Sequence, residues 1–427
     1  MFKEGLRRGL KLLGPRHGRD RQPPLTLHRR TPQSATEKRA LTNTADSARR
    51  RDKREKHSRP PALLRQGEAR RGRRASDAAP SKRTSADTPA VVKTVNLALQ
   101  GGGAHGAFTW GILDRLLEEA RINIEGISAT SAGAMNATVF TYGYARGGRD
   151  GAKAALAQFW KSISFAAMHS PLQPSWLDRM IGRHSLRFSP AFVMVDLLTR
   201  LFSPYEFNSF NHNPLKDLLE DSVDFAALRR SDSPIKLFLS ATNVRTGKVK
   251  VFERREIDAR HVLASSCLPF LFQAVEVDGE HYWDGGYMGN PAIFPLIYNC
   301  KSRDIVIVHI NPLEREEVPR TAMEILNRVN EISFNSSLMR EMRAIGFVTR
   351  LIDERAINGN RLKRLYIHRI AADEVMKRFG VSSKLNADWS FLMHLHAAGR
   401  QYADAWIEES FDRLGVESTI DLRALYL

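Results

Sequence analysis

A serine flanked by small residues is the first group in this chain whose type and setting could do chemistry. It lies in the run Ala129-Thr130-Ser131-Ala132-Gly133, between a short apolar stretch and a helical pattern. A serine on a sharp turn from strand to helix exposes its Oγ as a nucleophile. The general motif has glycine where Ala129 stands, and a methyl group there crowds the turn but keeps its geometry feasible. Ser131 could also be an ordinary helix N-cap, so the remaining motifs must decide.

A glycine-rich loop precedes this serine. The run Gly101-Gly102-Gly103-Ala104-His105-Gly106 follows the apolar residues 95–99 and precedes a helical pattern. The same spacing fits a dinucleotide fingerprint, but that site needs a carboxylate at the end of the next strand. That strand ends at residues 128–131 without a carboxylate, and Glu125 lies at its start. Because glycine N–H groups can turn toward one point, we predict an oxyanion hole formed by Gly101, Gly102, Gly103 and Ala104.

A carboxylate before a glycine pair follows far downstream, in Asp284-Gly285-Gly286. The glycines allow a tight turn that aims the Asp284 side chain. Asp-Gly is also the commonest hairpin dipeptide, which is the role we predict for Asp278-Gly279.

Histidine is the usual proton shuttle beside a serine nucleophile. His105 precedes Ser131, however, whereas in α/β-hydrolases the histidine follows both the serine and the acid. The later histidines His309, His394 and His396 are isolated residues of the kind that more often have a structural role. A histidine-containing triad stays as the alternative to a serine–aspartate pair.

The elements that must position these residues alternate between strand and helix. Residues 95–99 and 124–129 predict strands, and each leads directly into a helix. This βαβα opening indicates a parallel α/β sheet. Further on, residues 237–241 and 248–252 predict paired strands, 304–310 and 362–370 single strands, and 322–352 and 389–414 long helices. Residues 143–233 predict short helices broken by prolines. Some of the large apolar residues in these helices could form a lid or an acyl pocket.

The three motifs, in this order and on these elements, resemble those of the patatin-like phospholipases. The resemblance covers residues 93–310 and implies a three-layer α/β/α sandwich with a mainly parallel sheet. It implies Ser131 as nucleophile, Asp284 as its base, no catalytic histidine, and no metal or cofactor. Motif support comes from four further glycines: Gly106, Gly133, Gly285 and Gly286. Two positions depart from the family pattern, because Gln100 stands where an acidic or other polar residue is usual and His105 where Arg or Lys is frequent.

Composition divides the 427-residue chain into two parts. Residues 1–90 hold 25 of the 65 Lys and Arg but only 9 of the 47 Asp and Glu, so they carry +16 of the net charge of +18. We therefore predict a basic, disordered tail over 1–90 and a nearly neutral catalytic domain over 91–427. Two cysteines are too few for a disulfide framework or a cysteine-rich metal site, and no apolar run reaches the length of a spanning helix.

The first 13 residues have the spacing of a cationic amphipathic helix. Phe2, Leu6, Leu10 and Leu13 recur at helical intervals among Lys and Arg. The same pattern fits a solvated basic tail, an upstream start codon, or an Arg-rich mitochondrial-type presequence, although the acidic residues Glu4, Asp20 and Asp46 argue against the presequence. The favoured hypothesis is attraction to anionic membranes, with nucleic acid not expected as a partner.

The combined prediction is a serine lipid acyl hydrolase of phospholipase A, lysophospholipase or esterase type. We expect it in the cytoplasm or peripherally at the inner face of the membrane. The alternatives are a catalytically idle lipid-binding or scaffold protein, and a hydrolase of storage polyester or thioester substrates.

Overall fold

An eight-stranded sheet forms the centre of the described structure, with the order β5-β6-β3-β2-β1-β7-β8 and β4 paired to β3. The computed structural model describes residues 91–426 except 169, 171–185, 187–188 and 357–361. The strands are β1 (Lys93–Leu99), β2 (Ile122–Ala129), β3 (Lys236–Asn243), β4 (Val249–Glu253), β5 (Val275–Val277), β6 (Glu280–Asp284), β7 (Asp304–His309) and β8 (Tyr366–Ala371).

The middle of the sheet is parallel. Strands β3, β2, β1, β7 and β8 run in one direction, while β4, β5 and β6 form an antiparallel edge. Every residue of β7 is buried, and so is every residue of β1 from Val95 onward. Near-continuous apolar strands of this kind need cover on both faces.

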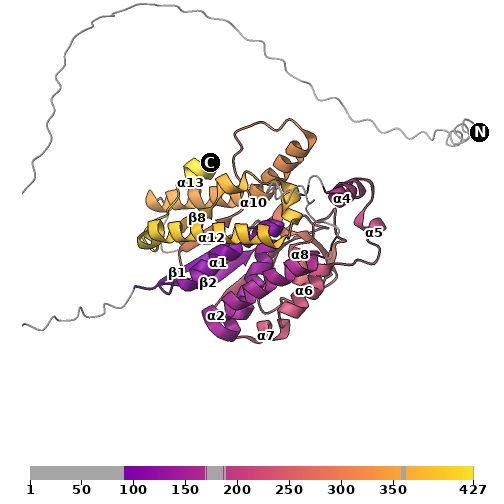
Figure 1. The fold of residues 1–427 in the computed structure, drawn as a ribbon. Helices are drawn as coiled ribbons and strands as arrows, with labels where there is room; N and C mark the ends of the chain where they lie inside the picture. Colours follow the sequence, from indigo (N-terminus) through magenta and orange to yellow (C-terminus); the bar gives the residue numbers. More distant parts are fainter. Residues whose placement is uncertain (1–90, 169, 171–185, 187–188, 357–361, 427) are drawn as a thin grey trace, which may run out of the picture. The chain divides into compact units, whose positions relative to one another are not determined.

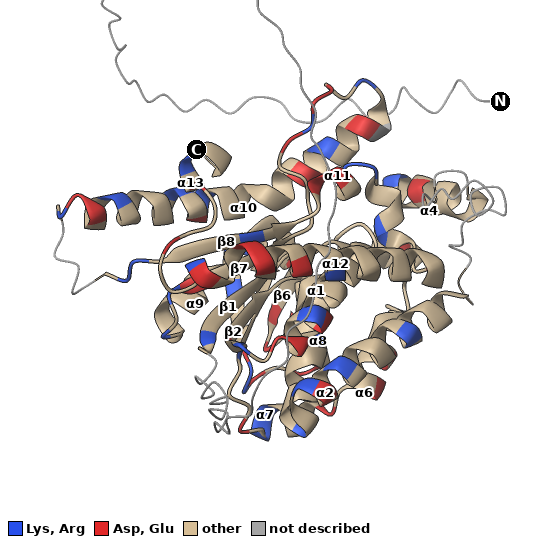
Figure 2. Ribbon diagram, turned by 60° about the vertical axis from the view of Figure 1, so that its left-hand side comes forward, with Lys and Arg blue, Asp and Glu red and all other residues tan. Residues whose placement is uncertain are grey.

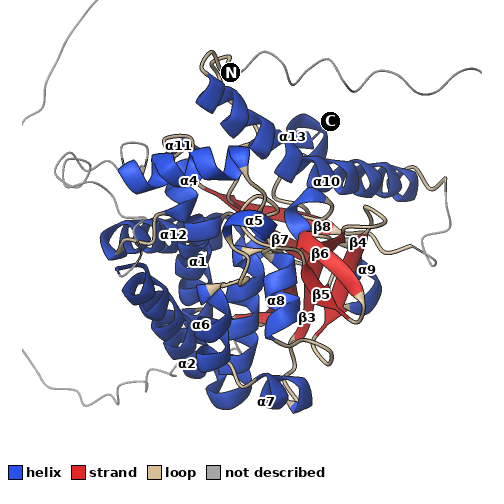
Figure 3. Ribbon diagram, turned by 90° about the vertical axis from the view of Figure 1, so that its right-hand side faces the viewer, coloured by secondary structure: helices blue, strands red, loops and turns tan. Residues whose placement is uncertain are grey.

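Helices supply that cover in two layers. One face packs against α1 (Gly106–Glu118), α2 (Ala132–Met168), α6 (Pro214–Ser222), α7 (Phe225–Arg230), α8 (Ala259–Ser265) and α12 (Trp389–Ser410) (Figure 1). The opposite face packs against α9 (Phe294–Asn299), α10 (Ala322–Asp353) and α13 (Leu422–Tyr426). Figure 3 shows the sheet between these two layers. The predicted three-layer α/β/α sandwich with a mainly parallel sheet is confirmed.

Shorter elements complete the described chain. They are α4 (Pro190–Leu201), α5 (Pro204–Phe207), α11 (Asp373–Met376), and the 3-10 helices η1 (Gly103–His105), η2 (Gly285–Tyr287), η3 (Val381–Leu385) and η4 (Phe411–Arg413).

Most predicted element types agree with the structure, and the differences concern their limits. The helix predicted over 322–352 is α10, and the strand predicted over 362–370 begins only at Tyr366. The helix predicted to Leu414 ends as α12 at Ser410 and continues as the 3-10 turn η4. The region predicted to hold only short helices begins inside the long α2, which bends at Gly147 and Gly148.

The Asp278-Gly279 hairpin is confirmed. It joins the antiparallel pair β5 and β6, and both turn residues have positive φ angles, 51° for Asp278 and 78° for Gly279. This geometry suits the right-handed twist of a two-residue hairpin.

Charged residues of both signs are scattered over the helices and loops of the described domain (Figure 2). No helix within the described ranges is long and apolar enough to cross a membrane. The predicted tail over 1–90 and the predicted helix over 1–13 lie outside the described residues.

Candidate active site

Ser131 lies on the turn between β2 and α2, at the carboxyl edge of the sheet. Its φ angle is +56°, a left-handed conformation that is strained for a residue with a side chain. Its N–H donates to Ser265 Oγ at 3.0 Å, and that hydroxyl donates in turn to the carbonyl oxygen of Ser240 at 2.7 Å. Ser265, at the end of α8, therefore helps to hold the strained turn. Sequence reasoning missed this contact.

The register of the sheet brings the glycine loop against this turn. Leu99 of β1 pairs with Ala129 of β2, so the residues that follow the two strands leave the sheet side by side. A Cβ atom on Gly101 would stand 2.5 Å from Ser131 Cβ, closer than two side chains can approach. Gly101 is therefore required by packing against the serine.

The other motif glycines are equally crowded. The distance from an added Cβ to the nearest atom would be 2.9 Å at Gly102, 2.3 Å at Gly103, 2.9 Å at Gly106, 2.5 Å at Gly133, 2.1 Å at Gly285 and 2.3 Å at Gly286. Gly133 lies against the backbone of Leu99 and Gln100, and Gly285 lies against the backbone of Ser240, so these glycines allow the serine turn and the aspartate turn to pack closely on the strand ends.

The glycine loop differs from the prediction in one donor. The N–H of Gly101 donates to Asn290 Oδ1 at 2.7 Å, so it is already occupied. Within the described part of the chain, the N–H groups of Gly102, Gly103 and Ala104 make no hydrogen bond. They precede α1, where the first N–H groups lack helical partners and the helix dipole is positive.

Asp284 ends β6 and pairs with Ala241 of β3, which brings it to the same edge of the sheet as Ser131. Its side chain is fully buried. Oδ1 accepts the N–H of Gly286 at 2.7 Å, whereas Oδ2 has no hydrogen-bond partner in the described residues. Burial raises the pKa of Asp284 to about 6, and this rise is opposed by the Gly286 N–H, the Ser131 hydroxyl and the Lys384 ammonium.

A Cβ on Gly285, the residue after Asp284, would stand 2.9 Å from Cγ2 of Thr130, the residue before Ser131, so the two turns are in contact. The Ser131 hydroxyl also lowers the pKa of Asp284, as expected of neighbouring side chains. Oδ2 has no hydrogen-bond partner in the described residues, and a carboxyl with a pKa of about 6 can both take up and release a proton near neutral pH. The structure therefore brings together the two residues that the sequence singled out 153 positions apart.

The four histidines considered from sequence have other contacts. His105 Nε2 lies 2.8 Å from Ser383 Oγ, and burial lowers the pKa of His105 to about 3. His309 Nδ1 lies 3.1 Å from Arg369, and His396 Nε2 lies 3.3 Å from Asp114. The ring of His394 is 6.4 Å from that of Phe379. These contacts do not support a histidine-containing triad.

A network of four buried side-chain amides lies beneath the glycine loop. Gln100 Nε2 donates to Asn335 Oδ1 at 3.1 Å, and Gln100 Oε1 accepts from the backbone N–H of Ile310 at 2.9 Å. Asn311 Nδ2 donates to the carbonyl oxygen of Gly101 at 2.9 Å. With Asn290 on the Gly101 N–H, these amides fix both polar groups of the first loop glycine. The sequence marked Gln100 only as a departure from the family pattern.

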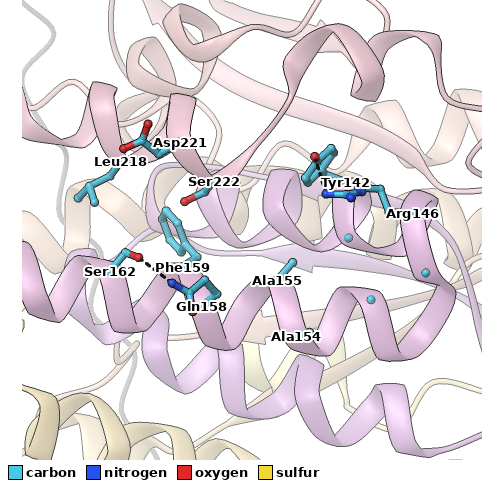
Figure 4. A pocket seen from close by; sticks show the side chains of 13 residues that line it. Tyr142, Arg146, Ala154, Ala155, Gln158, Phe159, Ser162, Leu218, Asp221 and Ser222 are labelled. Atoms are coloured by element: carbon cyan, nitrogen blue, oxygen red, sulfur yellow. Dashed lines mark hydrogen bonds between the residues drawn. The ribbon is translucent and has the colours of Figure 1, made fainter.

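A cavity of about 490 Å³ lies elsewhere, between the two halves of α2 and α6 (Figure 4). Tyr142, Phe159 and Asp221 are among its lining residues, and it includes neither Ser131 nor Asp284. Among the described residues no cluster of three or more His, Cys, Asp or Glu could hold a metal ion.

The fold and the serine turn define an α/β protein with a strained strand-to-helix serine turn at the carboxyl edge of its sheet. Residues 97–297 match the family model of the patatin-like phospholipases, so the chain contains a patatin-like phospholipase domain. This match supports a lipid acyl hydrolase. A comparison with curated proteins found no match.

Two solved structures are similar to the chain. VipD from Legionella pneumophila is 16% identical, with a TM-score of 0.29, over 72% of this chain and 67% of VipD. ExoU, in its complex with SpcU from Pseudomonas aeruginosa, is 15% identical with a TM-score of 0.28, over 73% of this chain and 53% of the other. The chain thus spans about half of the length of ExoU. TM-scores this low do not by themselves establish a shared fold.

Proposed function

We propose that this protein hydrolyses acyl esters of lipids with a Ser131–Asp284 dyad. The observation that carries the proposal is the buried Asp284 carboxyl beside the serine turn. Its Oδ2 has no hydrogen-bond partner in the described residues, and its pKa is raised to about 6. This is the environment expected of a general base that serves a serine nucleophile.

In the acylation step, Ser131 Oγ forms a bond to the carbonyl carbon while its proton passes to the Asp284 carboxylate. The carbonyl oxygen becomes negative and accepts hydrogen bonds from the N–H groups of Gly102, Gly103 and Ala104. When the tetrahedral intermediate collapses, the bond to the alcohol oxygen breaks and Asp284 returns the proton to that leaving group. The products are a free alcohol and an acyl ester on Ser131.

Deacylation repeats these proton transfers with water. Asp284 takes a proton from the attacking water, whose oxygen bonds to the acyl carbon, and the same N–H groups stabilise the new oxyanion. Collapse breaks the bond to Ser131 Oγ, which recovers its proton from Asp284. The fatty acid leaves and the enzyme is restored.

A substrate panel with purified protein tests this proposal. The panel contains phospholipids, assayed for cleavage at each acyl position, together with lysophospholipids, neutral glycerides, a storage polyester and acyl thioesters. We expect turnover of at least one lipid ester and a loss on the order of 10³-fold or more in Ser131→Ala. Equal turnover by wild type and Ser131→Ala would overturn the proposal, and no turnover by either would favour a lipid-binding protein.

The basic segment over residues 1–90 leads to a second part of the proposal, which concerns where in the cell the protein acts. Its charge of +16 would draw the protein from the cytoplasm to the anionic inner face of a membrane, with residues 1–13 as an interfacial helix. The nearly neutral domain over 91–427 would thereby be concentrated on its lipid substrate.

A further inference from the structure

Lys384 lies where the glycine loop, α10 and the aspartate turn meet. It belongs to η3, well beyond the residues 97–297 that match the family model. Its carbonyl oxygen is 2.3 Å from the point where a Cβ of Gly103 would stand, so the backbone of η3 packs directly on the loop. Gly103 has a φ angle of +58°, a conformation that this close approach leaves to glycine.

The ammonium group of Lys384 has contacts that lead to the glycine loop and to the aspartate turn. Nζ donates to Asn311 Oδ1 at 2.8 Å, and Asn311 donates to the carbonyl oxygen of Gly101. Nζ also lies 5.6 Å from the centre of the Phe334 ring, a cation–π distance. Phe334 packs against Gly286, whose Cβ would be 2.3 Å from the ring. One side chain is thus linked to the oxyanion loop on one side and to the aspartate turn on the other.

Three charged groups from neighbouring segments act on the Lys384 ammonium. Glu331 of α10 attracts the ammonium and Arg315 repels it, while Glu331 is itself paired with Arg315 and Arg328. Asp284 also attracts it, and burial lowers the pKa of Lys384 to about 8. On the η1 side, His105 has a pKa of about 3 and is uncharged at neutral pH.

Asp284 faces few other titratable groups. Cys267 and Tyr287 lie close to it, and burial raises the pKa of each to about 12, so both are uncharged at neutral pH. Among the described residues, Lys384 is the cation whose charge lowers the pKa of the Asp284 carboxyl. Burial raises the pKa of Asp284. Without the Lys384 charge, only the Gly286 N–H and the Ser131 hydroxyl would counteract this rise.

We propose that Lys384 is a positioning residue of the Ser131–Asp284 site, whose charge keeps Asp284 ionised and whose contacts hold the glycine loop beside Ser131. This inference rests on the proposed function. It adds to the active site a residue from the C-terminal part of the chain, which the three sequence motifs do not include. Lys384 acts through Asp284 and the loop, and no substrate contact is assigned to it.

The test is the pH dependence of kcat on a soluble short-chain ester for full-length wild type, Lys384→Met and Lys384→Arg. In Lys384→Met, loss of the cation should move the acidic limb to higher pH by about one unit, with kcat at pH 6 falling about 5- to 10-fold. KM should change little. Lys384→Arg should keep the acidic limb of wild type because it keeps the charge.

Lys363→Met is the matched control. Lys363 is also a partly buried lysine, and it donates to the carbonyl oxygen of Cys300 at 2.7 Å, near the opposite edge of the sheet. Its pKa is likewise lowered by burial. This variant should leave the acidic limb unchanged. An unshifted limb in Lys384→Met, with a loss of kcat no greater than in the control, would overturn the inference.

A second measurement applies if Lys384→Met does not fold. Lys384→Gln then replaces it, because the amide keeps a donor for Asn311 Oδ1 but carries no charge, and its acidic limb should move to higher pH by about one unit relative to Lys384→Arg. The same acidic limb in Lys384→Gln and Lys384→Arg would overturn the inference while leaving the dyad intact. If wild type shows no Ser131-dependent turnover, the proposed function fails and the inference fails with it.

Discussion

At the scale of single residues, the site depends on keeping a carboxylate where water is excluded. Asp284 is fully buried, yet its pKa of about 6 leaves it mostly ionised at neutral pH. A buried, ionised carboxyl lowers the stability of the fold, and this cost is typical of functional sites.

Asp284→Asn should lower kcat by about 10²- to 10⁴-fold, because the amide keeps the size of the carboxyl but cannot accept the serine proton. Circular dichroism should show an unchanged fold. An Asp284→Asn variant that retains wild-type kcat would remove Asp284 from the mechanism.

The same variant should be more stable than wild type at alkaline pH. The folded pKa of about 6 lies above the ordinary value of 3.8, so wild type loses stability as pH rises from about 4 through 6. Above this range the loss amounts to up to about 3 kcal/mol. Thermal unfolding at pH 8 and pH 4 measures it: the Tm advantage of Asp284→Asn should appear at pH 8 and disappear at pH 4.

His105→Ala should change kcat by less than about tenfold, since a histidine with a pKa of about 3 and a contact to Ser383 takes no part in proton transfer. The variant should lower Tm because it leaves a cavity beside Phe379 and Phe391. If its kcat fell as far as that of Asp284→Asn in a folded protein, the dyad assignment would be wrong.

At the scale of elements, the site is held by contacts between segments distant in sequence, among them side-chain oxygens that accept backbone N–H groups. Local patterns were enough to predict β1, α1, β2 and the serine turn, because strand, glycines and helix follow one another there. The partners of these elements leave no comparable local signal. Ser265 bonds to a residue 134 positions away and Asn290 to one 189 positions away, so ordinary serines and asparagines acquire their roles only after the chain folds.

Gly101→Ala tests this packing. A methyl group at Gly101 would stand 2.5 Å from Ser131 Cβ and must displace Ser131, the proposed nucleophile, which should lower kcat on the order of 10²-fold. The control is Gly147→Ala, because a Cβ at Gly147 would meet no atom within 4 Å. Equal kcat values for the two variants would show that the close approach of loop and serine does not matter for turnover.

At the scale of the whole molecule, the basic charge and the proposed chemistry belong to different parts of the chain. The type of fold could be predicted from the order of strands and helices. The role of η3 could not be predicted, because nothing in the sequence distinguishes Lys384 from the other lysines. Only the fold places it against the glycine loop.

Removal of residues 1–90 should spare hydrolysis of a soluble short-chain ester but weaken activity on anionic vesicles. Each Lys or Arg near such a surface contributes about 1 kcal/mol of attraction before screening. Liposome co-sedimentation of both forms should show a difference that shrinks as salt rises. Equal binding by both forms at low salt would assign the segment a different role.

The central claim, an activated nucleophile at Ser131, is tested most directly by labelling with a fluorophosphonate probe followed by peptide mapping. The structure predicts that wild type is labelled on Ser131, that Ser131→Ala is not labelled, and that Asp284→Asn is labelled much more slowly than wild type. Absence of labelling in folded wild type, or equal labelling of Ser131→Ala, would contradict the claim.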